Sequence, residues 1–191
     1  VAIQSGTSLD ELDESVDQRV VDLNASTMYQ LLAAEMMAYK GYAVQAYDVI
    51  YGLAVQTQNA DLAERAFQLS MKTYDVEKIE SATLLWREVS PQEAVPWRAS
   101  FLIALRRNDV SLALQQWQQY HKVSKAGLEQ DLLLTAQRVP ASPPSESAVM
   151  FLERLTQLFP NDWAAFFALG VVANVNNQTE VANSFGEGKK P

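Results

Sequence analysis

The sequence predicts an all-α fold, an array of about five antiparallel helix pairs, and three observations support this prediction. From residue 26 onward Ala, Leu, Gln, Glu and Met dominate, and apolar residues recur three and four positions apart, as on one face of a helix. Turn-forming residues interrupt this pattern at regular intervals, and no stretch is typical of a strand hairpin. A small residue followed four positions later by a large apolar one recurs along the sequence.

Residues 1–25 form an acidic leader with six acidic residues and one arginine. A capping box and apolar residues three or four apart predict a short amphipathic helix here. The alternative is a solvated leader that becomes helical only on docking, because short isolated helices are marginally stable in water. The leader could lie against Arg98, Arg106 and Arg107 until a partner displaces it. Its apolar positions are Leu9, Leu12, Val16, Val20 and Leu23.

After the leader, each expected repeat unit is a helix, a turn and a second helix. Asp61 with Glu64 is typical of an N-cap pair, and Ser90 followed by Pro91 predicts an N-cap with proline at the first helical position. Asn161 and Asp162, which follow Pro160, predict a further cap. The units are expected near residues 27–60, 61–93, 94–126, 127–160 and 161–191.

The recurring pair of a small and a large residue lies early in the second helix of each unit. There a small side chain lets the helix approach its partner closely, and the larger one fills the space between neighbouring pairs. Successive small residues are 36, 31, 35 and 34 positions apart. The pairs are Ala46/Ile50, Ala82/Trp86, Ala113/Trp117 and Ala148/Leu152, and Ala182 continues the series.

Composition excludes several classes of function. The 191 residues are 48% hydrophobic and 20% charged, which is typical of one folded domain or one continuous array. No apolar run is long enough to cross a bilayer. The net charge of -8 opposes nucleic-acid binding. With no cysteine and only His121, thiol catalysis, Cys-ligated metals and two-histidine zinc motifs are excluded, so we expect no enzyme activity, cofactor or metal.

Over residues 27–191 the protein resembles the tetratricopeptide repeat (TPR) family. That family has a 34-residue helix–turn–helix unit and stacks its units into a right-handed superhelix, which the resemblance therefore implies here. The second unit departs from the family pattern at Ser70 and Glu77, and the fifth at Gly186. The matching positions are Ala34, Met37, Gly41, Tyr42, Ala46 and Ile50 in the first unit, Trp97, Ala104, Asn108, Val110, Ala113, Trp117 and Tyr120 in the third, and Ala148, Leu152, Leu155 and Pro160 in the fourth.

Three segments are similar to the opening of proteobacterial envelope TPR lipoproteins: residues 29–35, 41–46 and 60–66. This resemblance implies a periplasmic location in a Gram-negative cell, with outer-membrane anchoring through a lipidated segment that this sequence lacks. A cytoplasmic location is the alternative. Because the sequence begins at Val1 rather than Met, we expect it to be trimmed.

In the TPR family, residues of the first helix of each unit line a concave groove that binds a peptide or a helix. The resemblance therefore implies a scaffold or adaptor that recruits another protein. Arg98 and Arg106 are eight apart on one predicted helix, so they share a face and could hold a carboxylate or an acidic segment. The groove positions are Glu35, Tyr39, Phe67, Met71, Tyr74, Arg98, Leu102, Arg106, Gln130, Phe167 and Asn174, together with Leu31, Leu133, Gln137 and Val171.

Other features favour structural roles. The four tryptophans, Trp86, Trp97, Trp117 and Trp163, are expected in the core, and His121 is expected to interact with a helix dipole. The last predicted helix is short after Ala182, so its apolar side lacks a capping helix. This supports an alternative hypothesis, a structural segment that packs on the remainder of a longer protein or on a second copy. RNA binding by a related helical repeat is a third hypothesis, and the negative charge opposes it.

Overall fold

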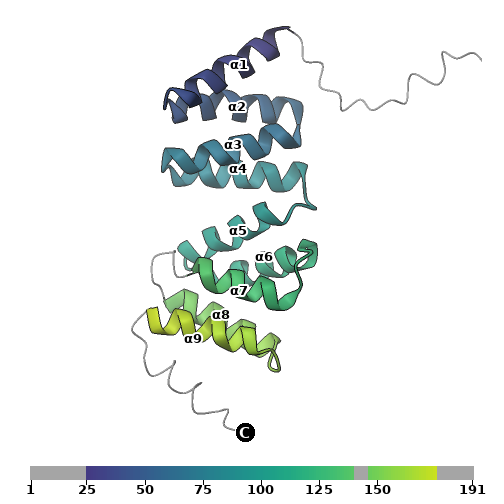
Figure 1. Ribbon diagram of the computed structural model, residues 1–191, viewed down its shortest axis with the longest axis vertical. Coiled ribbons are helices and arrows are strands. Elements are labelled where there is room, and N and C mark those ends of the chain that lie inside the picture. The colour runs from purple at the N-terminus through teal and green to yellow at the C-terminus, as the bar shows by residue number, and fades with distance from the viewer. Residues whose placement is uncertain (1–24, 140–145, 176–191) are drawn as a thin grey trace, which may run out of the picture. The chain divides into compact units, whose positions relative to one another are not determined.

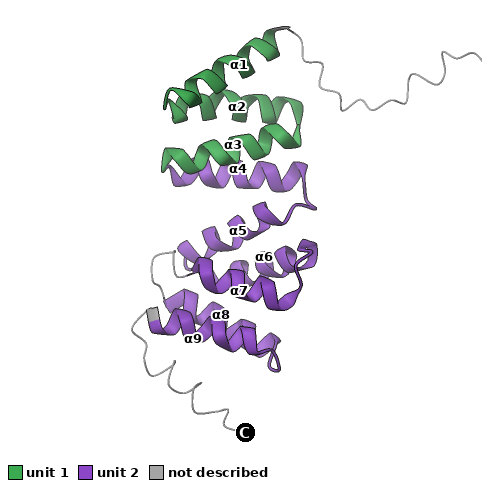
Figure 2. Ribbon diagram, viewed as in Figure 1, with its two compact units in different colours: residues 1–74 green, residues 75–191 purple. Residues whose placement is uncertain are grey.

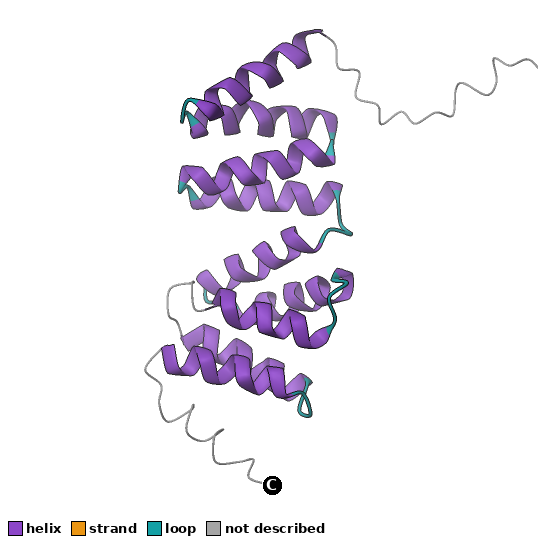
Figure 3. Ribbon diagram, viewed as in Figure 1, coloured by secondary structure: helices purple, strands orange, loops and turns teal. Residues whose placement is uncertain are grey.

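The computed structural model describes residues 25–139 and 146–175, and these residues form nine α-helices and no strand (Figures 1 and 3). The predicted all-α class is confirmed for this part of the protein. The leader helix, Ala182 and Gly186 lie outside the described residues. The helices are α1 (Ala25–Tyr39), α2 (Ala43–Thr57), α3 (Ala60–Thr73), α4 (Val76–Val89), α5 (Ala94–Arg106), α6 (Val110–Val123), α7 (Leu128–Arg138), α8 (Glu146–Leu158) and α9 (Trp163–Val175).

The protein divides into two compact units, residues 1–74 and residues 75–191 (Figure 2). Unit 1 contains α1, α2 and α3, and α2 packs against both of the others. The boundary between these compact units, after Tyr74, falls inside residues 61–93, which the sequence period assigns to one repeat. In unit 1 the buried side chains of α2 recur at helical spacing, so one face of this helix forms the centre of the core. They are Ala46, Tyr47, Ile50, Leu53 and Ala54.

Unit 2 contains α4 to α9 and a larger apolar core. α5 packs against α4 and α6, α8 packs against α6 and α9, and α7 packs against α9. Phe101 of α5 stacks on Phe151 of α8 with ring centroids 5.7 Å apart, and Trp117 of α6 is fully buried in the same core. Within each unit, every helix therefore packs on at least one other helix, as in a helical repeat.

The recurring small residues are buried, as the packing role predicted for them requires. Ala46, Ala82, Ala113 and Ala148 each expose 2% of their surface or less. The large residues that follow them by four positions are buried as well: Ile50, Trp86, Trp117 and Leu152. Each pair lies in the second helix of an expected unit, namely α2, α4, α6 and α8.

Two predicted helix starts are wrong in detail. The N-cap of α3 is Asn59, whose side chain accepts a hydrogen bond from the backbone N–H of Leu62 at 3.0 Å, while Asp61 lies in the first turn. α5 begins at Ala94 rather than beside Ser90, so Pro96 and not Pro91 lies in its first turn. There the N–H that proline lacks has no partner within the helix.

The other caps are local contacts made by aspartates. Asp162 caps α9 as predicted, accepting a hydrogen bond from the N–H of Ala164 at 2.9 Å. Asp75 and Asp109 cap α4 and α6 in the same way. Each carboxylate satisfies backbone N–H groups that the first turn of a helix leaves unpaired.

The tryptophans divide between the core and the surface. Trp86 and Trp117 are buried as predicted, and Trp97 is half-buried. The prediction for Trp163 is wrong, because this side chain is 52% exposed. It is the first residue of α9, at the end of the helix, and its ring contacts Phe167 one turn further on, with centroids 5.9 Å apart.

Candidate protein-binding surface

In unit 1 the predicted groove residues lie on α1 and α3 and differ widely in exposure. Tyr39 ends α1 and Tyr74 follows α3, and their side chains are 93% and 91% exposed. Met71 is half exposed, whereas Phe67 and Glu35 are half-buried. The two tyrosines and Met71 are therefore available to a partner.

Glu35 is engaged within unit 1. Arg65 of α3 donates from Nε to Oε1 at 2.7 Å and from Nη2 to Oε2 at 2.6 Å, which is a two-pronged ion pair between α1 and α3. The hydrogen bonds from Arg65 lower the pKa of Glu35, outweighing the partial burial that raises it. Glu35 therefore joins α1 to α3, a role that its place in the predicted groove does not reveal.

α1 exposes more apolar surface than the predicted groove positions suggest. Of the described side chains on this helix only Ala34 is buried. The exposed large apolar residues of α1 are Met28, Tyr29, Leu32, Met36, Met37 and Tyr39. Exposed apolar side chains gathered in this number on one element are normally covered by a partner. Because the groove positions follow a family register, they miss most of these residues; the signal in the sequence is the near absence of charge between residues 25 and 39.

A hollow of about 410 Å³ lies beside the exposed surface of α1. Met36 and Met37 of α1 line it, together with Tyr42 at the turn into α2. Lys40 is the one charged residue in its lining. Methionine and tyrosine side chains adapt well to an apolar partner surface.

In unit 2, α5 carries Arg98, Leu102 and Arg106. Leu102 is half-buried and packs against the core, while Arg106 is exposed. Neither arginine has a hydrogen-bond or ion-pair partner within the described ranges 25–139 and 146–175. Arg98 is close enough to Tyr120 to oppose the rise in its pKa, but burial dominates and the pKa of Tyr120 is raised to about 12.

The predicted groove positions of the fourth repeat, residues 127–160, line one hollow. Gln130, Leu133 and Gln137 of α7 line a surface depression of about 550 Å³. On α9, Phe167 is 50% exposed beside Trp163, and Asn174 is exposed near the end of the helix. These residues are accessible, so unit 2 presents further contact surface.

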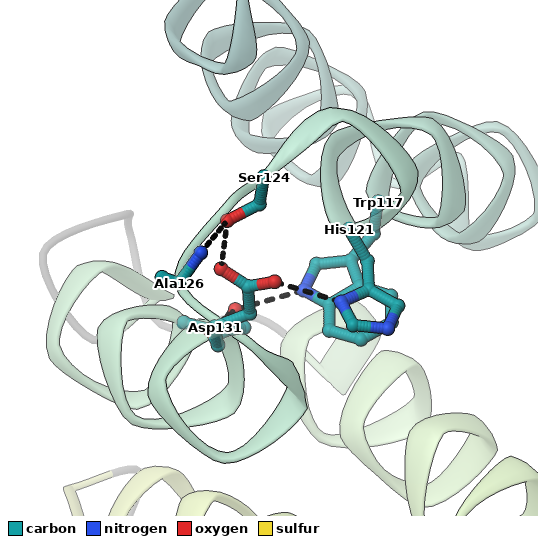
Figure 4. Close-up of polar contacts among 6 residues, drawn as sticks. Trp117, His121, Ser124, Ala126 and Asp131 are labelled. Carbon is teal, nitrogen blue, oxygen red and sulfur yellow. Dashed lines mark hydrogen bonds and ion pairs between the residues drawn. The ribbon is translucent and has the colours of Figure 1, made fainter.

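His121 belongs to a polar cluster between α6 and α7 (Figure 4). Asp131 is fully buried, and its two carboxylate oxygens are bonded to His121 Nδ1 at 2.7 Å and to Ser124 Oγ at 2.6 Å. The His121 ring also stacks on Trp117, with centroids 5.5 Å apart. Asp131 lies between His121 and Ser124, so the histidine is not placed to take a proton from the serine as in a catalytic triad. Full hydrogen bonding is what a buried carboxylate requires.

The Trp117 indole connects to this cluster through Thr135. Its Nε1–H donates to Thr135 Oγ1 at 2.8 Å, and the Thr135 hydroxyl donates to the carbonyl of Asp131 at 2.7 Å. These bonds tie α6 to α7. Over residues 25–139 and 146–175 no group of three or more His, Cys, Asp or Glu side chains is arranged to hold a metal ion.

The sequence matches no protein-family model and no curated protein sequence. None of the described helices combines the length and the apolar character that crossing a membrane requires.

Proposed function

We propose that the protein is a TPR-type scaffold that binds another protein and catalyses no reaction. The period of the buried alanines supports the repeat assignment, because Ala46, Ala82, Ala113 and Ala148 lie in the first half of every second helix, α2, α4, α6 and α8. The first helices α1 and α3, joined by the Glu35–Arg65 ion pair, supply the binding surface. The similarity of the first segments to envelope lipoproteins favours a periplasmic complex.

One observation supports this function above the others: the exposed apolar surface of α1. Met28, Tyr29, Leu32 and Met36 are each more than half exposed. Burying such side chains against a partner is favourable by about 25 cal/mol for each Å² removed from water. The exposed apolar side chains of α1 are therefore better explained by a partner that covers them than by permanent exposure to solvent.

The surface also defines the partner's chemistry. Glu35 is the only charged residue of α1, which spans residues 25–39, and Arg65 already neutralises its charge. A highly charged segment would gain little here. An amphipathic helix or a peptide with an apolar face fits, because its anchors can enter the hollow beside Met36, Met37 and Tyr42.

The test is affinity capture from envelope extract with three forms of the protein, followed by titration calorimetry with the purified captured partner. The first is unchanged, the second carries Leu32→Glu and Met36→Glu on α1, and the third carries Val55→Glu and Met150→Glu. The third form adds the same charge at exposed apolar positions on α2 and α8.

We expect the unchanged protein and the control to retain the same partner with equal affinity, and the α1 variant to bind it at least about tenfold more weakly, since a buried carboxylate without a partner is strongly unfavourable. Circular dichroism establishes that all three forms are folded. Equal binding by all three would show that α1 is not the binding surface.

The exposed pair of Trp163 and Phe167 on α9 favours a second candidate, a structural segment that associates through this helix. For a second copy as the partner, sedimentation equilibrium is expected to give twice the mass of 21.3 kDa, and Phe167→Ser is expected to restore the monomer mass. A monomer mass at all concentrations contradicts self-association and leaves the scaffold function in place.

A further inference from the structure

Arg87 of α4 is a half-buried guanidinium that forms no hydrogen bond or ion pair with a carboxylate of the described residues. Burial lowers the pKa of Arg87, and no neighbouring acid offsets this effect. Charged groups that lose water are normally paired. The missing counter-charge therefore requires an explanation.

The guanidinium is held by neutral groups on two neighbouring helices. Its Nη1 donates to Gln116 Oε1 of α6 at 2.8 Å and to Ser100 Oγ of α5 at 3.3 Å. The indole of Trp97 covers one face, with its ring centroid 4.8 Å from Arg87 Cζ. A stacked and hydrogen-bonded guanidinium has lost much of its freedom before any ligand arrives.

The residues that hold Arg87 are themselves fixed. Trp97 Nε1 donates to the carbonyl of Pro91 at 2.8 Å, and Ser100 Oγ donates to the carbonyl of Pro96 at 2.9 Å. The serine proton is thus used, so its oxygen can accept from Arg87. Two layers of contacts therefore orient the guanidinium.

The other edge of the guanidinium is free. Nε and Nη2 of Arg87 have no acceptor among the described residues. In that part of the protein, every side-chain nitrogen that is buried has a hydrogen-bond partner. These two nitrogens must therefore reach solvent. Their N–H bonds run parallel and match the two oxygens of a carboxylate.

A pocket of about 130 Å³ borders Arg87. Its remaining charged residues are Arg107 and Glu80, which form an ion pair with each other, so the three charges sum to one positive charge. Leu84, Ile103 and Leu112 supply apolar lining, and both leucines are substantially exposed. This small pocket with one net cation and an apolar rim suits a carboxylate on a short apolar stem.

We propose that the pocket formed by Arg87, Ser100 and Gln116 binds a carboxylate of a protein partner, through the Nε and Nη2 edge of Arg87. The inference that a protein carries this group rests on the proposed scaffold function. The carboxylate belongs either to an acidic side chain or to the C-terminus of a polypeptide, because both present the same two oxygens. The site differs from the predicted pair Arg98 and Arg106, since neither of those residues lines the pocket.

The test is an NMR titration of the whole 191-residue protein, following the Arg87 Nε–H and the Trp97 indole N–H. The probes are N-acetyl-glutamate amide for the carboxylate of a side chain, N-acetyl-leucine for a C-terminal carboxylate, N-acetyl-glutamine amide as the neutral match, and inorganic phosphate as another anion. Arg87→Gln removes the charge at the pocket, and Arg106→Gln removes the same charge from an exposed position on α5.

At least one carboxylate probe is expected to shift both signals with saturation, and the glutamine probe is expected to leave them unchanged. The probe that binds more tightly identifies the source of the carboxylate. Because Arg87→Gln removes one of the two signals, the Trp97 indole reports on the variants. Through it, Arg87→Gln is expected to weaken binding by about tenfold or more, and Arg106→Gln by less than about twofold.

Several results would overturn the proposal: no saturable shift with either carboxylate, equal shifts with the glutamine probe, tighter binding of phosphate, or an unchanged affinity in Arg87→Gln. Circular dichroism and the Trp97 signal of the free variant show whether it remains folded. If Arg87→Gln were unfolded, the comparison of acid and amide probes on the unchanged protein would still decide the matter.

The two proposals fail separately. A captured partner that binds Arg87→Gln normally but loses affinity for the α1 variant would leave the scaffold function standing and exclude a partner carboxylate at the pocket. Binding of a carboxylate probe without capture of any protein would establish the pocket and contradict the scaffold function.

Discussion

At the scale of single residues, Asp131 shows how unit 2 accommodates a buried acidic side chain. The side chain is fully buried, yet both of its oxygens are bonded, one to His121 and one to Ser124. His121 lies in the last turn of α6, where the sequence predicts an interaction with the helix dipole, but the contacts of its ring are with Asp131, Trp117 and Phe159. His121, the single histidine of the sequence, therefore helps to hold α6 and α7 together.

Tyr120 leads to a prediction about alkaline pH. It is 3% exposed, and burial, with a smaller contribution from hydrogen bonding to Asp131, raises its pKa from 10.0 to about 12. The folded state thus holds the phenolic proton more tightly than the unfolded state. This contribution to stability is fully present below pH 10 and is lost as the pH rises toward 12.

Between about pH 9 and pH 11.5 the unchanged protein is expected to lose roughly 2 kcal/mol more free energy of unfolding than Tyr120→Phe, measured by urea titration. Tyr39→Phe, at an exposed position, serves as the control and is expected to follow the unchanged protein. Parallel pH profiles for all three proteins would mean that Tyr120 titrates normally.

At the scale of helices, small buried residues recur along the sequence. Ala46, Ala82, Ala113 and Ala148 are buried in α2, α4, α6 and α8, and each is followed by a buried large residue. The caps that mark where helices begin are Asn59, Asp75, Asp109 and Asp162. Spacing and caps are both local properties, which explains why the pattern is visible in the sequence.

Ala113→Leu is expected to lower the free energy of unfolding by about 1–3 kcal/mol, because the added carbon atoms must enter a space that is already filled. Ala99→Leu on α5, where the alanine is half-buried, is the matched control and is expected to cost less. Urea titration followed by circular dichroism measures both. Equal costs would show that the repeated alanine has no special packing role.

At the scale of the whole molecule, the protein has two compact units, each with buried apolar residues of its own. All four tryptophans lie in unit 2, at positions 86, 97, 117 and 163. Tryptophan fluorescence therefore reports on unit 2 alone, while circular dichroism reports on the helices of both units. This asymmetry makes the unfolding of each unit measurable in the intact protein.

Ile50→Ala removes a fully buried side chain from unit 1 and is expected to destabilise that unit by about 2–5 kcal/mol. Part of the circular dichroism signal is then expected to disappear at lower urea concentration, while the midpoint of the fluorescence transition stays unchanged. Leu152→Ala, the counterpart in unit 2, is expected to move the fluorescence midpoint. A fluorescence midpoint that moves equally with both variants would indicate that the protein unfolds as one cooperative block.

The helices, their order and the buried small residues follow from local pattern, because helix propensity, apolar spacing and caps act over a few residues. Local pattern misplaces the start of α5 because the sequence offers two prolines near it, and the helix begins at Ala94 with Pro96 in its first turn. Local pattern also wrongly assigns Trp163 to the core. The residue type indicates burial, but the side chain is exposed at the first residue of α9.

The candidate sites depend on contacts between distant residues, and these no local pattern contains. Glu35 meets Arg65 across 30 positions, and Arg87 meets Gln116 across 29. Spacing places Glu35 on a helix face without revealing its partner, and nothing in the sequence singles out Arg87. Which charges are paired, which are left with a free edge and which apolar faces stay uncovered are decided by packing in three dimensions, because burial and counter-charges come from residues that are far apart in sequence.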